Sequence, residues 1–310
     1  MLVKVLGSAA GGGFPQWNCG CSNCRRLREG VFKGRARTQA QVAVSSDGSS
    51  WVLLNASPDL RQQLSQHAEF APAAETRSTP ITAIILTNAD VDAVIGLLHL
   101  REFQPLRIYS TVSVRRVLTE ENSLFRMLER SSPPVQWEAL CLGRAVSICE
   151  RAPLGTKASL SCKAVPLGGS FPEYVSDTLR QSLSPQEAVV GLELTQDGKR
   201  FFYAPTLPGR GDDWKCHAKE SNLALLDGTF WRDSELVDIR GSGTTAREMG
   251  HLPLSGANGL LEQLRDAPDT RCVLIHVNNT NPVLDEESEA NAALRDAGWE
   301  LAYDGMEIEL

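Results

Sequence analysis

The chain has 310 residues, of which 42% are hydrophobic and 22% charged, and its formal net charge is −7. This composition supports a sizeable core and excludes global disorder, and the acidic balance argues against nucleic acid as the main partner. The sequence lacks the run of about 18 apolar residues that a membrane span needs, and its first apolar stretch is too short for a signal peptide. We therefore predict a cytoplasmic protein.

Short apolar runs predict strands, and two pairs of these runs flank Asp-Gly turns that are typical of hairpins. The predicted strands cover residues 2–6, 41–44, 51–54, 81–86, 107–109, 146–149, 164–167, 188–194, 200–204, 222–226, 272–275, 299–303 and 306–310. Helical patterns cover residues 60–65, 93–100, 113–128, 259–264 and 286–297. No repeat or linker divides the chain, so we predict one domain, residues 1–310, in which helices cover two mixed sheets.

The strand predicted at residues 81–86 is followed by Asn88, Asp90 and Asp92 and then by an apolar helix. In layered α/β folds, ligands and metals usually bind at the carboxyl ends of strands, which favours a site here. A capped helix explains the same residues equally well, because Asn and Asp are common at helix N-termini. On the same helix, His99 is interpreted as a core histidine rather than a ligand.

Eight cysteines occur, and three of them, Cys19, Cys21 and Cys24, fall within six residues. Three soft thiolates in one Gly- and Asn-rich turn can converge on a tetrahedral ion, for which zinc is the usual metal. The alternatives are three unligated thiols or a redox pair. We predict a structural zinc site whose fourth ligand comes from elsewhere and whose metal contributes to folding free energy. The other five cysteines are interpreted as buried or inert thiols.

Two more predicted strands lead into side chains that suit a polar site. Asp227 follows the strand at 222–226, and His276 follows the strand at 272–275 and precedes several amide side chains. His251 lies in a Gly-rich loop before a predicted helix. We predict a cleft lined by residues that follow strands or lie in this loop, namely Asp90, Asp92, Asp227, His251 and His276.

These strand ends, the two hairpins and the leading glycine loop resemble the metallo-β-lactamase fold. The resemblance implies an α/β (α+β) four-layer αββα sandwich with a metal site at the strand ends. The hallmark of that fold is His-x-His-x-Asp-His after a strand, whereas this chain has Asn88-x-Asp90-x-Asp92-Ala93. Because three of the imidazoles are replaced, a two-metal hydrolytic centre of the usual kind is not expected.

Longer motifs across nearly the whole chain resemble the coenzyme PQQ biosynthesis protein B family. They are Gly-Gly-Gly-Phe-Pro-Gln-Trp-Asn-Cys-Gly-Cys-Ser-Asn-Cys24, Leu-Asn-Ala-Ser-Pro-Asp-Leu60, Gly-Leu-Leu-His-Leu-Arg-Glu102, Leu-Leu-Asp-Gly-Thr-Phe-Trp231, Met-Gly-His-Leu-Pro253 and His-Val-Asn-Asn-Thr-Asn-Pro282. The family assists production of pyrroloquinoline quinone (PQQ), a redox cofactor made from a Glu–Tyr pair in a ribosomal peptide. Many members keep a His after the motif Asp, where this chain has Ala93.

The resemblance implies two functions that remain alternatives here. One is an iron-dependent hydroxylase acting on the tyrosine ring of a Glu–Tyr precursor, and the other is a carrier that transports PQQ or a precursor to the periplasm. For the first, the expected ligands of a catalytic Fe(II) are Asp92, His251 and His276, with Asp227 ligating or orienting. A metal-dependent hydrolase follows from fold analogy alone.

Related phosphodiesterases of this fold share the three-cysteine zinc site and complete it with a His three residues after the last active-site His. By that resemblance the fourth position is Asn279, a weak zinc ligand for which a nearby side chain, a water molecule or His276 could substitute. The expected partners are a small-molecule PQQ precursor or PQQ, a second copy of the chain in a homodimer, and other proteins of the PQQ pathway.

Overall fold

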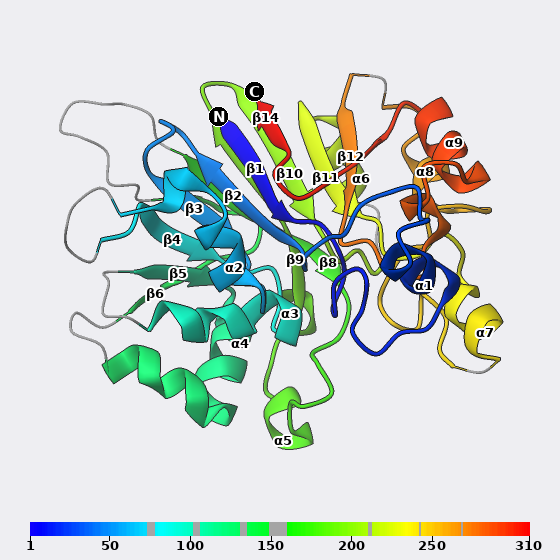
Figure 1. Cartoon of the computed structure of the whole chain (residues 1–310). Helices are drawn as coiled ribbons and strands as arrows, with labels where there is room; N and C mark the ends of the chain where they lie inside the picture. Colours follow the sequence, from blue (N-terminus) through cyan, green and yellow to red (C-terminus); the bar gives the residue numbers. More distant parts are fainter. Residues whose placement is uncertain are drawn as a thin grey trace.

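The structure, a computed structural model, describes residues 1–72, 78–101, 106–130, 135–148, 160–209, 213–241, 243–267 and 269–310. Its strands form two mixed sheets (Figure 1). The first contains β1 (Leu2–Gly7), β2 (Gln41–Ser45), β3 (Trp51–Leu54), β4 (Ile81–Ile85), β5 (Arg107–Ser110), β6 (Gln136–Ala139) and β14 (Glu307–Glu309). The second contains β7 (Ala145–Ser147), β8 (Ser161–Gly168), β9 (Val189–Gln196), β10 (Lys199–Ala204), β11 (Leu223–Asp227), β12 (Arg271–Ile275) and β13 (Glu300–Leu301).

Both sheets combine an antiparallel part with a parallel part. Their strand orders are β14-β1-β2-β3-β4-β5-β6 and β13-β12-β11-β10-β9-β8-β7. Strands β3 to β6 are mutually parallel, and so are β10 to β13. Parallel strands place their carboxyl ends at one edge of a sheet, so the segments that follow β4, β11 and β12 are available to build a common site.

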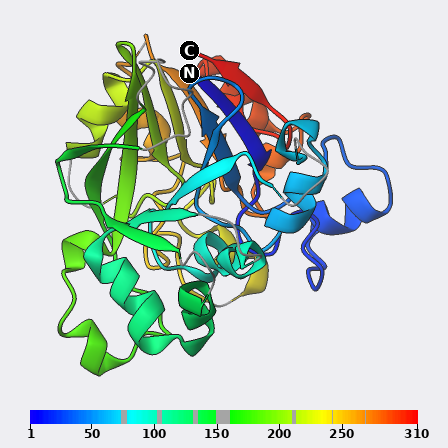
Figure 2. The same ribbon diagram turned by 90° about the vertical axis from the view of Figure 1, so that its left-hand side faces the viewer.

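The two sheets face each other across an apolar layer, and each is covered on its outer face (Figure 2). Along β3, Val52 and Leu54 belong to the layer between the sheets, whereas Trp51 and Leu53 belong to the layer beneath the helices. Successive side chains of a strand point to opposite faces. Burial of both faces therefore explains why these strands are continuous apolar runs in the sequence.

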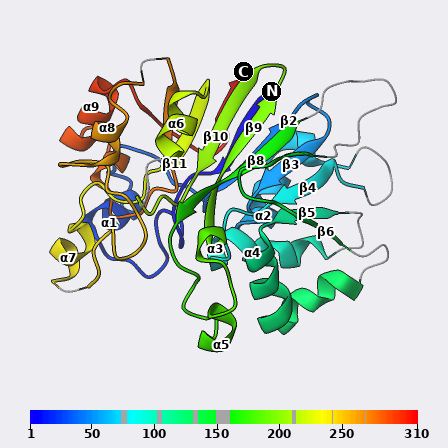
Figure 3. The same ribbon diagram turned by 180° about the vertical axis from the view of Figure 1, so that it is seen from behind.

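The helices are short and flank the two sheets (Figures 1 and 3). Those beside the first sheet are α2 (Leu60–Ser65), α3 (Val91–Val94) and α4 (Val112–Arg116), and those beside the second are α6 (Asp213–Lys219), α8 (Leu260–Gln263) and α9 (Glu289–Asp296). Three more, α1 (Ser22–Arg28), α5 (Asp177–Arg180) and α7 (Glu235–Arg240), lie in loops. This arrangement confirms the predicted αββα sandwich of two mixed sheets. Within the described ranges, none of the helices has the length and apolarity that a bilayer crossing requires.

Several predicted boundaries differ from the structure for local reasons. The helix predicted at 113–128 is α4 followed by a π turn and a 3-10 segment, with Asn122 donating its side-chain amide to the carbonyl of Val117. The helix predicted at 286–297 begins later, because Ser288 accepts the backbone N–H of Asn291 as an N-cap. Part of the strand predicted at 146–149, Cys149, lies outside the described residues, and β6 was missed because its side chains are largely exposed.

Candidate metal sites

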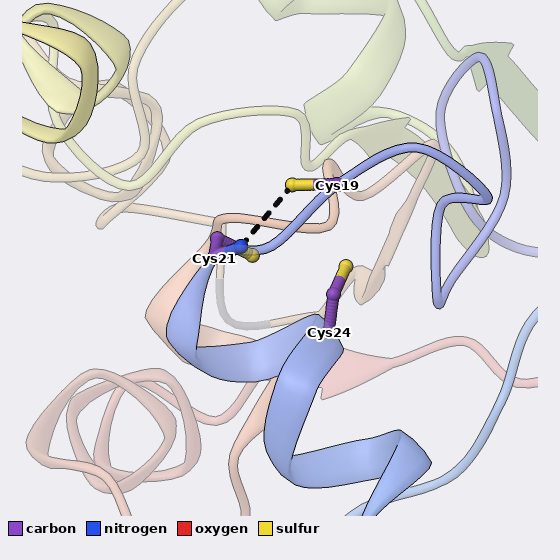
Figure 4. A group of neighbouring side chains, drawn as sticks. All are labelled: Cys19, Cys21 and Cys24. Carbon is purple, nitrogen blue, oxygen red and sulfur yellow. Dashed lines mark hydrogen bonds between the residues drawn. The ribbon is translucent and has the colours of Figure 1, made fainter.

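Three sulfurs gather beside the start of α1. Cys19 and Cys21 precede the helix, and Cys24 lies on it, fully buried. One atom from each of these side chains lies within 4.8 Å of the other two (Figure 4). The spacing brings them together because the turn from Cys19 to Cys21 is followed at once by a helical turn that carries Cys24 to the same side. The geometry suits a tetrahedral zinc ion.

Asn279 faces all three sulfurs from the loop after β12. Its side-chain Nδ2 lies 3.1 Å from the sulfur of Cys19, 3.4 Å from that of Cys21 and 3.3 Å from that of Cys24. Asn23 donates to the backbone carbonyl of Asn279 and so holds the two segments together. A half-turn of the Asn279 amide exchanges Nδ2 for Oδ1, which would direct an oxygen ligand toward the sulfurs.

Burial distinguishes the thiols of this cluster. Burial raises the pKa of Cys24 to about 11. Burial would also raise the pKa of Cys19, but the backbone N–H of Cys21 and neighbouring side chains lower it below its usual value. Among the other described cysteines, Cys162 and Cys272 are buried, and Cys141 and Cys216 are exposed and far along the chain from this turn. Among the described cysteines, only Cys19, Cys21 and Cys24 therefore lie close enough together to share a metal ion.

A second cluster forms where the parallel strands end. Asp227 ends β11, His276 directly follows β12, and His251 comes from the loop between α7 and α8. Each offers one atom that lies within 4.8 Å of those offered by the other two. The imidazole rings of His251 and His276 stack at 22°, with centroids 5.5 Å apart. His276 has a φ of 60°, a left-handed backbone conformation that residues other than Gly rarely adopt. Such strain is often found at functional sites.

Asp227 is fully buried and accepts four hydrogen bonds. Its Oδ2 accepts the backbone N–H of Leu207 at 2.8 Å and Nδ1–H of His251 at 2.7 Å. Its Oδ1 accepts the backbone N–H of Thr229 at 3.0 Å and the Thr229 hydroxyl at 2.5 Å. These donors use the lone pairs of both oxygens, so Asp227 orients its neighbours and has little capacity to bind a metal itself. His251 then directs Nε2, with its lone pair, away from Asp227.

The Thr229 hydroxyl extends this orientation to His276. The hydroxyl has one proton, which its short bond gives to Asp227, so it accepts Nδ1–H of His276 at 2.9 Å. Nε2 of a neutral His276 is then an acceptor, and it faces Oδ2 of Asp92 at 3.0 Å. Two facing acceptors require a proton or a cation between them. The 3.0 Å spacing is that of an ordinary N–H···O hydrogen bond, so a proton between the two atoms accounts for it, and His276 and Asp92 would be the groups that hold a cation there.

Comparisons with known proteins show the family and the fold of this chain. Residues 50–277 match the model of the Beta-lactamase superfamily domain. Proteins named Coenzyme PQQ synthesis protein B from Azotobacter vinelandii and Methylococcus capsulatus are 41% and 42% identical to this chain, with both chains covered in full. The chain belongs to the coenzyme PQQ synthesis protein B family. The crystal structure of zinc-bound PqqB from Methylobacterium extorquens superimposes with a TM-score of 0.89 at 36% identity, over 100% of both chains.

A more distant structure shows the fold alone. A diphosphatase of the PhnP family has a TM-score of 0.64 at 17% identity. The predicted family and fold are thus confirmed for this member of the PQQ synthesis protein B family. The individual ligands are not tested by these comparisons and remain predictions.

The electrostatics of the second cluster follow from its burial and its charges. Burial would raise the pKa of Asp92, but its hydrogen bond to His276 and the nearby imidazoles lower it below its usual value. Burial would lower the pKa of His276, but Asp92 and the other carboxylates raise it. The pKa of Asp227 is likewise lowered, because His251 outweighs the effect of burial. Without a metal, Asp92 and His276 therefore favour an ion pair.

Asp90 lies beside this cluster but turns toward another side chain. Its Oδ2 accepts the side-chain amide of Asn88 at 2.8 Å, and its backbone N–H donates to Asn88 at 3.2 Å. Burial and the charge of Asp92 raise the pKa of Asp90 to about 6. Among the described contacts, Asp90 makes no hydrogen bond to either imidazole, so it borders the site in this structure.

A small cavity and the glycine loop adjoin Asp92. The volume in which the centre of a water molecule can lie is about 10 Å³, which is room for about one water molecule. The cavity is lined by Ala40, Asn55, Asn88, Asp92, Ala93, Pro205, Thr206 and His276. A Cβ atom added at Gly11 would lie 3.3 Å from Oδ2 of Asp92, so the loop backbone approaches the carboxylate closely because it has no side chain there.

Two interpretations from the sequence are corrected. His99 is exposed and is not a core histidine, because the 3-10 turn Ile95–Leu100 directs it outward. His276 is not available as a substitute zinc ligand, since both of its ring nitrogens face Thr229 and Asp92. Thr229 was missed, although its place two residues after a strand-end Asp is a usable signal.

Proposed function

We propose that this chain takes part in PQQ biosynthesis as an iron-dependent hydroxylase of a Glu–Tyr-derived precursor. The names of its relatives support the pathway. The reaction is supported chiefly by one observation, that Asp227 orients His251 directly and His276 through Thr229. This network leaves two imidazole Nε2 atoms for a metal, and Asp92 supplies the carboxylate.

The two clusters suit different metals. Two imidazoles and a carboxylate with open positions suit Fe(II), which when bound supplies activation of dioxygen. The three thiolates of Cys19, Cys21 and Cys24 suit zinc, which the PqqB of Methylobacterium extorquens contains. We therefore assign zinc to the cysteine site as a structural ion and Fe(II) to the site of Asp92, His251 and His276.

The protein groups around the second site bind and orient. Asp227 and Thr229 fix the tautomers of the two imidazoles, which leaves Nε2 of each ring as the nitrogen with a free lone pair. Gly11 brings backbone close to Asp92, and the polar backbone of this loop offers hydrogen bonds to the amide and carboxylate groups of a dipeptide-like precursor. Asn88 and Asp90 hydrogen-bond to each other beside Asp92.

The test combines metal analysis with turnover. Protein loaded anaerobically with Zn and Fe(II) is compared with His251→Ala, His276→Ala and the control His99→Ala, which changes an exposed histidine. We expect two ions per chain in the wild type and in the control, and loss of iron with retention of zinc in the two site variants. Addition of a Glu–Tyr precursor, air and a two-electron reductant such as ascorbate should give a product heavier by one oxygen atom, with the second atom of dioxygen released as water. Iron binding and product formation by both site variants would contradict the proposal.

A carrier of PQQ or its precursor is the second candidate. It is favoured by Asn88, Asp90 and Ala93, which stand where the fold usually has imidazoles. In that case the precursor binds and is recovered unchanged in the presence of Fe(II) and air. Transport to the periplasm, a cytoplasmic location, a homodimer and contacts with other pathway proteins stay predictions.

A further inference from the structure

The loop between β8 and β9 reaches across from the second sheet to the first sheet. Thr111 donates its hydroxyl to the carbonyl of Glu187 at 2.9 Å, and the Glu187 carboxylate accepts the backbone N–H of Ser113 at 2.8 Å. Farther along, Glu121 accepts the backbone N–H of Ser176 at 2.8 Å. Figures 1 and 3 show this loop running past α3 to α5 at the foot of the molecule, and the hydroxyl of Tyr174 in the loop donates to the carbonyl of Ala89. The loop therefore stands against the turn that carries Asp90 and Asp92.

Hydrogen bonds within the loop fix the conformation of its tip, residues 171–183. The guanidinium of Arg180 donates to the carbonyls of Phe171, Pro172 and Val175, at 2.8, 2.9 and 3.2 Å. The apolar side chains that flank the tip are buried, namely Phe171, Val175, Leu179 and Leu183. Such a loop presents its remaining side chains in fixed positions.

Tyr174 is the aromatic residue that this tip exposes. Its hydroxyl donates to the carbonyl of Ala89, directly before Asp90, while 41% of the residue remains exposed. Burial and the charge of Asp90 raise its pKa. Val91, between Asp90 and Asp92, is 54% exposed. The ring is thus tethered at its polar end to the turn that carries Asp90 and Asp92, and much of its surface remains open.

We propose that Tyr174 lines the substrate site and selects a precursor that has an aromatic ring. A single exposed apolar side chain needs no special explanation. Here the braced tip and the hydroxyl tether fix the ring before binding, so ordering it costs little when a ligand arrives. A phenol ring of the substrate can stack on it or meet it edge to face. The inference rests on the proposed function for the identity of the substrate.

The test measures binding separately from turnover. The affinities of the metal-loaded full chain for the dipeptides Glu–Tyr and Glu–Leu are measured anaerobically by calorimetry, since both have the same charges and differ in the ring. We expect a preference for Glu–Tyr of about 2- to 10-fold, the size of an aromatic pair contact. Tyr174→Leu should remove the preference, whereas Tyr174→Phe should keep most of it.

Tyr303→Leu is the matched control, because Tyr303 is 37% exposed and packs on Arg35 away from this loop. It should keep the wild-type preference. A Tyr174→Leu protein that keeps the preference, or a wild type with equal or no measurable affinity for the two dipeptides, would overturn the inference. If Tyr174 were merely structural, Tyr174→Leu would weaken both dipeptides equally and leave their ratio unchanged. A wild type with the preference intact but no oxygen insertion would contradict the proposed hydroxylase and leave the role of Tyr174 standing.

Discussion

The cysteine cluster and the Asp–His cluster are built from the chain in different ways. Three sulfurs come from six consecutive residues at the start of α1, and a single distant residue, Asn279, meets them. The Asp–His cluster takes its groups from segments after β4, β11 and β12 and from the loop before α8, so it depends on the alignment of both sheets.

Because of this difference, the two clusters depend on different parts of the structure. The cysteine cluster requires its own turn and one loop, and a metal there adds stability to that junction. The Asp–His cluster requires a network, because Asp227 and Thr229 orient the imidazoles that would bind the ion. Damage to the first should therefore appear mainly in folding, and damage to the second mainly in metal affinity and chemistry.

The largest effect is expected for Cys24→Ser. Cys24 is a proposed zinc ligand, so we expect its replacement to cause loss of the zinc together with destabilisation on the order of 4 kcal/mol. Zinc content by mass spectrometry and the free energy of unfolding in urea measure both. Cys216→Ser, which changes an exposed cysteine on α6, should match the wild type. A Cys24→Ser protein with one tight zinc and wild-type stability would show that the sulfurs are unligated.

Asp227→Asn should act on the other cluster. The amide keeps the shape but directs N–H groups at neighbours that themselves donate, so the imidazoles lose their orientation. We expect iron affinity to fall about 10- to 100-fold, as is typical when a group that orients a ligand is changed. Competition with a chelator measures this affinity. Asp238→Asn, at an exposed position of α7, is the control, and unchanged iron affinity in Asp227→Asn would count against the network.

Changes at Asn279 sharpen the question of the fourth zinc ligand. Asn279→Asp supplies a carboxylate oxygen and should strengthen zinc binding, whereas Asn279→Ala leaves the position to water and should weaken it by about tenfold, or about 1.4 kcal/mol. Zinc dissociation constants measure both, and iron affinity should stay the same. Equal zinc affinity in the two variants would mean that position 279 does not ligate the ion.

The smallest effect is expected at the turn between β2 and β3, outside both clusters. Asp47 accepts the backbone N–H groups of Ser49 and Ser50 at 2.7 and 2.8 Å, and these bonds outweigh burial and lower its pKa. Its contribution is therefore present above the unfolded pKa of about 4 and is lost as pH falls through the lower folded pKa.

For Asp47→Ala we expect about 1 kcal/mol of destabilisation near neutral pH, shrinking below about pH 4. Unfolding in urea across pH gives the profile. Zinc and iron content should not change, and a loss that persists undiminished at low pH would contradict the role of the carboxylate.

Local chemistry made part of this molecule predictable from the sequence. The cysteine turn could be recognised without tertiary information, because its three thiols are near neighbours along the chain. Asp227 and His276 were also predicted, since each directly follows a recognisable buried strand. The ends of β11 and β12 lie at the same edge of the second sheet, which confirms that Asp227 and His276 are neighbours. Whether they bind a metal stays a prediction.

The remainder depended on contacts between distant segments. Nothing local shows that the Thr229 hydroxyl connects Asp227 with His276, or that Tyr174 crosses to the carbonyl of Ala89. Asp90 follows the same strand as Asp92, yet Asn88 determines where its carboxylate points. Sequence periodicity also cannot distinguish a continuous helix from the sequence of α, π and 3-10 turns that follows Thr111.

The pairing of β1 with β14 has a consequence for synthesis on the ribosome. Val3 pairs with Ile308, and the sulfurs of Cys19 and Cys24 meet Asn279 across separations of 260 and 255 residues. At usual translation rates, these partners emerge on the order of ten seconds or more after the cysteines. During that interval the thiols have no closed site, so a reducing environment and late metal loading would govern the yield of correctly assembled protein.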